Sequence, residues 1–126
     1  MDLATAKKMT AAAMAEAIKN KWNVAVSVVD THGFLVYFEK LDHTQTGSIE
    51  VAIYKARSAA MYRRSTRVFQ DAVANGSYGL LTLAGMSAVS GGLPIMQDGK
   101  VIGAIGTSGA TADQDEQVSQ AGLAGM

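Results

Sequence analysis

The stretch SGGLPIMQDGKVIGAIGTSGATADQDE, from Ser90 to Glu116, decides the fold that this sequence predicts. Leu93 to Gln97 and Lys100 to Thr107 are two short apolar runs, each with the length of a strand. Asp98-Gly99 separates them, and this dipeptide is favoured in two-residue turns because both central positions need a positive φ. The stretch therefore predicts a β-hairpin, with strands near residues 93–97 and 100–108.

Glycines are dense in and around this hairpin. Gly91 and Gly92 precede it, and Gly103, Gly106 and Gly109 follow at intervals of three. Glycine removes a side chain where another backbone or a ligand comes close. The spacing matches neither the dinucleotide-binding fingerprint nor a Walker A loop, so a phosphate cradle is not expected.

The end of the stretch predicts the start of a helix. Thr111 and Gln114 have the spacing of a capping box, and Asp113, Asp115 and Glu116 fall in the first turn. These carboxylates occupy the positive end of the helix, which a bound anion would need. The carboxylates are therefore a second reason not to expect phosphate binding.

Upstream of residue 90 the patterns alternate between helices and strands. Leu3 to about Lys21 has apolar residues at helical spacing, and residues 24–29 and 34–39 are strand-like runs on either side of a turn. Further helices are expected from about Ser48 to Arg64 and from Arg67 to Asn75. Because an isolated hairpin is marginal in water, we expect both hairpins to join in one sheet. The predicted fold is a single α/β (α+β) domain, an antiparallel sheet flanked by helices.

The helix that begins near Ser48 is apolar on two faces. A stripe with Ile49 is expected to face the core, while Val51, Tyr54 and Met61 form a strip on the far side. In a domain this small we expect that strip to be buried against another subunit. Charged residues make up only 17% of the chain, less than a free monomer usually carries. The sequence thus predicts a homo-oligomer.

Lys55 stands among small residues of the same helix, in a row with Ser48, Ala52 and Ala59. A lone lysine there either extends to solvent or points its ammonium group into a pocket. Residues 76–92 form a long loop that contains several glycines, so the loop is a candidate lid or pocket wall.

Composition excludes several classes of function. Eleven basic and eleven acidic residues give a net charge of zero, so neither nucleic acid nor an anionic membrane is an expected partner. Cysteine is absent, which excludes disulfides, thiolate metal sites and cysteine nucleophiles. No long apolar run and no signal-peptide pattern occurs, so a cytoplasmic location is expected.

The chain offers few catalytic groups. Its two histidines, His32 and His43, lack the spacing of known metal sites, so a dedicated metal site is not expected. Nothing in the sequence places a histidine beside a serine, which argues against a serine hydrolase. Lys55, with Asp42 or Asp115, is the candidate acid/base set.

The whole chain resembles the GlcG/HbpS family, the small heme-binding-type domain that also forms the C-terminal part of PduO proteins. The likeness is carried by Gly91 to Ile95, Asp98-Gly99, Val101 to Gly109, Gln114 to Glu116, Val28 to Asp30 with Gly33 and Leu35, Lys40 to Asp42, and Ser48 to Ala59 with Lys55. The resemblance implies a profilin-like domain that forms homo-oligomers and binds small molecules, in several members heme.

Heme as a cofactor needs an axial ligand and a roomy apolar pocket. The N-terminal helix carries no histidine, so the conceivable axial ligands are His43, His32, Tyr37, Tyr54 and the methionines.

One ligand site is predicted where the loop before the hairpin meets the end of its second strand and the helix of Lys55. Its predicted ligand-binding residues are Ser48, Lys55, Gly91, Gly92, Pro94, Ser108 and Gly109. The Lys55 ammonium group would suit a carboxylate or propionate. The competing interpretation is that Lys55 forms a structural ion pair with Asp42 or Asp115 and that the glycines serve only backbone packing.

Three classes of function remain open. The first is an oligomeric protein that binds heme or another planar or carboxylated metabolite. The second is an accessory catabolic enzyme that hydrolyses or isomerises a carboxylated intermediate with Lys55 and an aspartate. The third is a structural or regulatory subunit.

Overall fold

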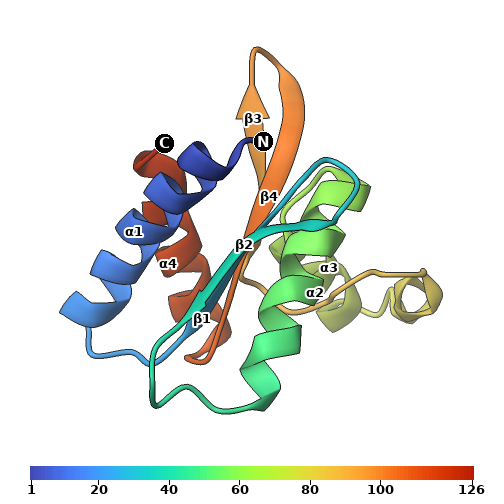
Figure 1. The fold of residues 1–126 in the computed structure, drawn as a ribbon. Coiled ribbons are helices and arrows are strands. Elements are labelled where there is room, and N and C mark those ends of the chain that lie inside the picture. Colours follow the sequence, from blue (N-terminus) through green and yellow to red (C-terminus); the bar gives the residue numbers. More distant parts are fainter.

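The computed structural model describes residues 1–126, and their helices and strands form the predicted α+β fold. The elements in chain order are α1 (Leu3–Lys19), β1 (Ala25–Val29), β2 (Leu35–Lys40), α2 (Gly47–Tyr62), α3 (Thr66–Ala74), the 3₁₀ helix η1 (Tyr78–Thr82), β3 (Gly92–Gln97), β4 (Lys100–Ser108) and α4 (Ala112–Ala124). The four strands form one antiparallel sheet in the order β2-β1-β4-β3 (Figure 1).

The two predicted hairpins are confirmed, and they join along their inner strands. β1 pairs with β2, β3 pairs with β4, and β1 pairs with β4, where Val28 lies opposite Ile105. The turn between β3 and β4 is Asp98-Gly99, and both residues have positive φ, 52° and 78°. All neighbouring pairs are antiparallel, so the sheet contains no βαβ crossover.

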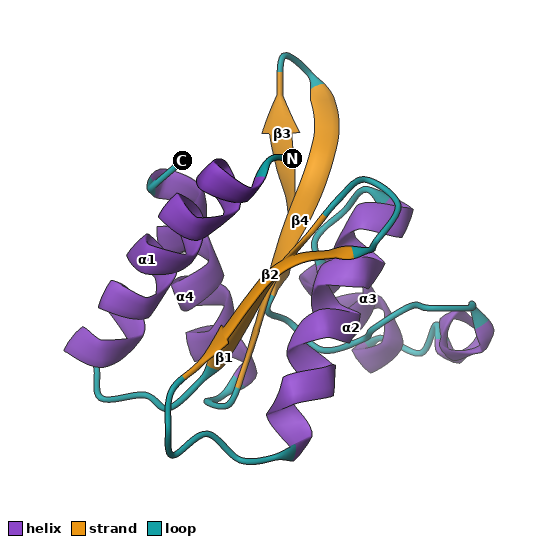
Figure 2. Ribbon diagram, in the orientation of Figure 1, coloured by secondary structure: helices purple, strands orange, loops and turns teal.

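Helices cover both faces of the sheet. Figure 2 shows α1 and α4 together on one side and α2 with α3 on the other. The hydrophobic core therefore has two clusters, one on each face of the sheet. The larger cluster lies between the sheet and the helices α1 and α4, and it includes Met9, Ile105 and Val118. The smaller cluster lies under α2 and is built almost entirely from alanine.

Helix α2 packs directly on the backbone of the sheet. The Ser27 hydroxyl donates to the Ala52 carbonyl oxygen at 2.8 Å. A β-carbon at Gly106 would overlap that same carbonyl oxygen, and one at Gly92 would overlap the carbonyl oxygen of Lys55. Two of the glycines that the sequence singled out are therefore required by the close approach of a helix to two strands.

Helix α1 ends two residues earlier than predicted. Asn20 is its C-cap, and Lys21 adopts a left-handed backbone with φ of 61°. The Lys21 N–H donates to the Ile18 carbonyl at 3.1 Å, and the Trp22 N–H donates to the Ala17 carbonyl at 2.9 Å. These two bonds are those of a Schellman motif, which terminates a helix.

The remaining boundaries agree with the predictions to within two residues, and β4 spans residues 100–108 as predicted. β1 and β2 each begin one residue later, at Ala25 and Leu35. α2 ends at Tyr62 because Arg63 has a left-handed φ of 53°. The chain then restarts as α3 after Ser65, whose side chain accepts a hydrogen bond from the Arg67 N–H.

Residues 76–89 leave the body of the domain. Figure 1 shows this segment, with η1 at its far end, projecting away from the sheet beyond α2 and α3. Tyr78, Leu81 and Leu83 on it are exposed.

No helix in the structure combines the length and hydropathy that a membrane-spanning segment needs.

Candidate functional site

Lys55 lies on the face of α2 that covers the sheet, and its ammonium group has no access to solvent. Its Nζ atom donates to Asp115 Oδ2 at 2.9 Å and to the Thr107 carbonyl oxygen at 3.0 Å. The side chains of Lys55 and Asp115 are only 1% and 3% exposed. The two residues form a buried ion pair that ties α2 to α4 across the end of β4.

Asp115 is placed for this role by the start of α4. The predicted capping box is confirmed, since Thr111 and Gln114 exchange both hydrogen bonds. The Asp115 Oδ1 atom accepts a hydrogen bond from the Ala110 N–H at 2.9 Å. Burial raises the pKa of the Asp115 carboxyl, while the Lys55 ammonium and the backbone N–H groups oppose that rise.

Gly91, just before the β3–β4 hairpin, lies directly against this ion pair. A β-carbon at Gly91 would come within 3.0 Å of the Lys55 Nζ atom and within 2.7 Å of the Thr107 carbonyl oxygen. The Gly91 carbonyl oxygen accepts a hydrogen bond from the Ser119 hydroxyl at 2.7 Å. The end of the loop predicted as a lid or pocket wall is therefore packed over the Lys55 ammonium group.

Of the residues predicted to bind a ligand, Gly109 lines a cavity. Six others line no cavity in the structure: Ser48, Lys55, Gly91, Gly92, Pro94 and Ser108. Asp42 is exposed and lies in a separate hollow that Lys55 does not reach. The geometry corresponds to the competing interpretation, a Lys55–Asp115 ion pair with glycines that serve backbone packing. Ligand binding by all seven residues, Gly109 included, stays a prediction.

A second polar network lies beside the ion pair, and the sequence did not predict it. Arg67 in α3 pairs with both Asp113 and Glu116 of α4. The Ser90 hydroxyl donates to Glu116 Oε2 at 2.6 Å, and the Ser90 N–H donates to the side chain of Gln70. These contacts anchor the end of the projecting segment to the domain. The acidic residues in the first turn of α4 were recognisable in the sequence, but the sequence did not show that Arg67 would pair with them.

An apolar groove of about 530 Å³ runs along the outer face of α2. We call it the α2 groove; it is lined by Val51, Tyr54, Arg57, Leu81 and the segment Gly85 to Val89. Arg57 donates from Nε to the Gly33 carbonyl at 3.2 Å, and its guanidinium carbon lies 5.9 Å from the centre of the Tyr54 ring. Arg57 has no carboxylate partner within ion-pair distance.

Two adjoining hollows lie at the end of the sheet where α1, β2 and β4 meet loops. The larger, about 480 Å³, includes His43, Trp22 and Gly109 in its lining, and the smaller, about 380 Å³, includes Asp42 together with His43 and Trp22. His32 sits at the tip of the β1–β2 turn, is exposed and lines no cavity. No group of three or more histidine, aspartate or glutamate side chains is arranged to hold a metal ion.

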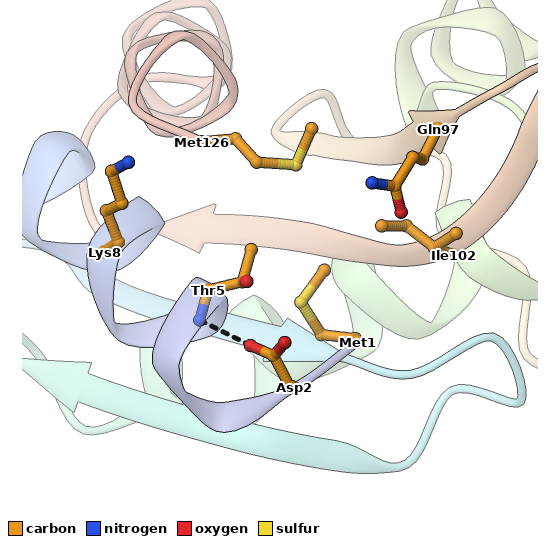
Figure 3. A pocket seen from close by; sticks show the side chains of 7 residues that line it. All are labelled: Met1, Asp2, Thr5, Lys8, Gln97, Ile102 and Met126. Carbon is orange, nitrogen blue, oxygen red and sulfur yellow. Dashed lines mark hydrogen bonds between the residues drawn. The ribbon is translucent and has the colours of Figure 1, made fainter.

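A fourth hollow, of about 250 Å³, lies between the two chain ends and the β3–β4 hairpin. Figure 3 shows its lining side chains, among them Lys8, Gln97 and Ile102, and the hydrogen bond from the Thr5 N–H to the Asp2 carboxylate at 2.7 Å. That bond caps α1. The Asp2 carboxylate thus has a structural partner.

The chain is similar in sequence to proteins of Citrobacter freundii, Escherichia coli and Salmonella typhimurium. The chain is 38% identical over 125 residues to an uncharacterised 15.0 kDa protein of Citrobacter freundii encoded between dhaT and dhaS, a match that covers 96% of this chain and 88% of that protein. It is 37% identical over 103 residues to protein GlcG of Escherichia coli, which covers 82% and 77% of the two chains. A match at 31% identity to the corrinoid adenosyltransferase PduO of Salmonella typhimurium covers 94% of this chain but only 37% of PduO.

Two solved structures have the same fold over nearly the whole length of this chain. The PduOC:heme complex superposes with a TM-score of 0.89 at 27% identity, covering 100% of this chain and 94% of the other. A double mutant of HbpS from Streptomyces reticuli gives a TM-score of 0.90 at 30% identity, covering 98% and 85%. The model of the family described as "Haem degrading protein HbpS-like" matches residues 1–124. On this evidence from sequence and fold together, the chain belongs to the HbpS-like family.

Proposed function

We propose that the protein is a homo-oligomeric small-molecule-binding protein whose ligand is heme or another planar molecule with carboxylate groups. The observation that carries the proposal is the α2 groove, an apolar space of about 530 Å³ with an unpaired arginine at its wall. Sites for small molecules are typically concave, mostly apolar and furnished with a few polar groups that orient the ligand.

The α2 groove has the chemistry that such a ligand needs. Val51, Leu81 and Val89 offer apolar contact to a flat ring system. Arg57 has only its Nε atom engaged within the chain, so its terminal nitrogens remain for a carboxylate in a two-pronged hydrogen bond.

The α2 groove offers axial ligand types for heme other than histidine. Tyr54 supplies a phenolic oxygen and Met86 a thioether sulfur, both of which are known axial ligand types for heme iron. Bound heme would supply redox or oxygen chemistry at the iron. The chain itself would bind the flat ring through apolar contacts, orient it through Arg57 and limit the access of water. Similarity to the PduOC:heme complex and to HbpS supports this part of the proposal.

Titration with hemin tests the proposal directly. We expect a saturable shift of the Soret band, a changed spectrum in Tyr54→Phe, and about tenfold weaker binding in Arg57→Gln because a charge-assisted bond to a carboxylate is lost. Lys100→Gln is the matched control, since it removes one charge far from the groove and should bind like the wild type. Iron-free protoporphyrin IX separates ring and carboxylate recognition from iron ligation. If hemin gives no Soret shift, the heme part of the proposal fails.

The oligomer is proposed on the same face of the molecule. Val51, Tyr54 and Met61 are 39%, 51% and 45% exposed in the single chain, which is costly for apolar side chains that remain in water. The projecting segment adds Tyr78 and Leu81. Burial against a second copy would remove this surface from water. Light scattering at micromolar concentration should give a mass above that of one chain, and Met61→Lys should lower it.

A further inference from the structure

The lysine that ends helix α1 occupies a position that favours glycine. Lys21 has φ of 61° at the first residue beyond the C-cap of a Schellman motif. Glycine is the usual residue there because it adopts a positive φ without steric cost, whereas a side chain adds strain. A lysine at this position places an ammonium group at the end of the sheet at an energetic cost, which a function of that group would offset.

Lys21 forms no ion pair with any carboxylate of the chain. The larger hollow at the end of the sheet is lined by Lys21, His43 and neutral side chains only. The nearby acids of α4 are engaged elsewhere, since Asp113 pairs with Arg67 and Asp115 with Lys55. Asp42 shares the adjoining smaller hollow with Lys21 but does not line the larger one. The larger hollow, about 480 Å³, is therefore lined by the Lys21 side chain and by no carboxylate.

An aromatic side chain forms one wall of this space. Trp22 is half-buried, packs against the main core cluster, and lines both hollows. The end of β4 closes the space from the other side, because Gly109, with φ of 142°, lies so close to Asn23 that a β-carbon there would overlap the Asn23 carbonyl oxygen. An indole fixed by the core beside a free ammonium group suits a flat ring with a negative charge.

We propose that the hollow formed by Lys21, Trp22 and His43 binds a small aromatic carboxylate, with the ring against the Trp22 indole and the carboxylate on the Lys21 ammonium group. His43 and the side-chain amide of Asn23 are further donors at the same rim. This site is separate from the α2 groove, with which it shares no lining residue, and it does not depend on the function proposed there.

The chain carries its own probe for this site, because Trp22 is its only tryptophan. We expect benzoate to change the Trp22 fluorescence in a saturable manner. Lys21→Gly should weaken that binding about tenfold, the loss expected for one charge-assisted hydrogen bond. The variant should fold at least as stably as the wild type, because glycine relieves the strained backbone. Lys100→Ala, which removes a distant charge, should leave the benzoate titration unchanged.

Two comparison ligands and one further variant test whether benzoate binds at Trp22 through both its ring and its charge. Cyclohexanecarboxylate has the charge without the flat ring, and inorganic phosphate has charge alone, so both should bind much more weakly than benzoate. Equal binding of either one overturns the proposal, as does a folded Lys21→Gly variant that binds benzoate like the wild type. Arg57→Gln should not affect benzoate. If it abolishes the signal, benzoate occupies the α2 groove, and the site at Trp22 is refuted while the proposed function stands.

Discussion

Removing the Lys55 ammonium group should destabilise the protein strongly and in a pH-dependent way. Lys55→Met keeps much of the side-chain volume but leaves the Asp115 carboxylate buried without its cation, at 3% exposure. Breaking a buried ion pair by removing one partner typically costs about 3–5 kcal/mol. The Thr107 carbonyl oxygen also loses its hydrogen bond from Lys55, so we expect a loss at the upper end of that range.

The pH dependence follows from the pKa of Asp115, which burial already raises above its ordinary value of 3.8. Without Lys55 nothing cationic opposes burial, so the folded-state pKa rises further. A raised folded-state pKa means that the folded protein binds the proton more tightly than the unfolded chain. Stability from this group is therefore fully present below 3.8 and is lost as pH rises through the raised folded-state pKa. The deficit of Lys55→Met should be largest at neutral pH and smaller in mild acid.

Urea unfolding followed by circular dichroism measures both effects. The double variant Lys55→Met with Asp115→Asn is the matched control, because it removes both charges and should recover a large part of the loss at neutral pH. If Lys55→Met unfolds at the same urea concentration as the wild type at neutral pH, or if the double variant is no more stable than the single one, the assignment of a buried ion pair is refuted.

Two further substitutions test how the helices are held. Gly92→Ala should cost about 3 kcal/mol or more, because its β-carbon would overlap the Lys55 carbonyl oxygen, whereas Gly47→Ala, with no atom near the added methyl, should stay within about 1 kcal/mol of the wild type in urea unfolding. Thr111→Ala should lose about 1 kcal/mol with the capping box, and Thr46→Ala, whose side chain makes no capping bond, should lose almost nothing; equal losses in thermal melts would contradict the capping role.

Features that depend on a few consecutive residues were predictable from the sequence. Asp98-Gly99 specified the β3–β4 turn, and Thr111 with Gln114 specified the start of α4, because turn and cap geometry are set by local backbone conformation. The end of α1 was missed for a local reason as well. The left-handed position is occupied by Lys21 and not by glycine, so the usual signal for a helix end was absent.

The role of Lys55 could not be read from its neighbours in the chain. The small residues around it are compatible with an open pocket and with a closely packed helix, and only the fold decides between them. Its partner Asp115 lies 60 residues further along, on the helix that follows β4. The groove outside α2 likewise combines that helix with residues 81–89. Sequence patterns specify local conformation and which residues prefer burial, whereas the partner of a buried charge is fixed only when distant elements pack together.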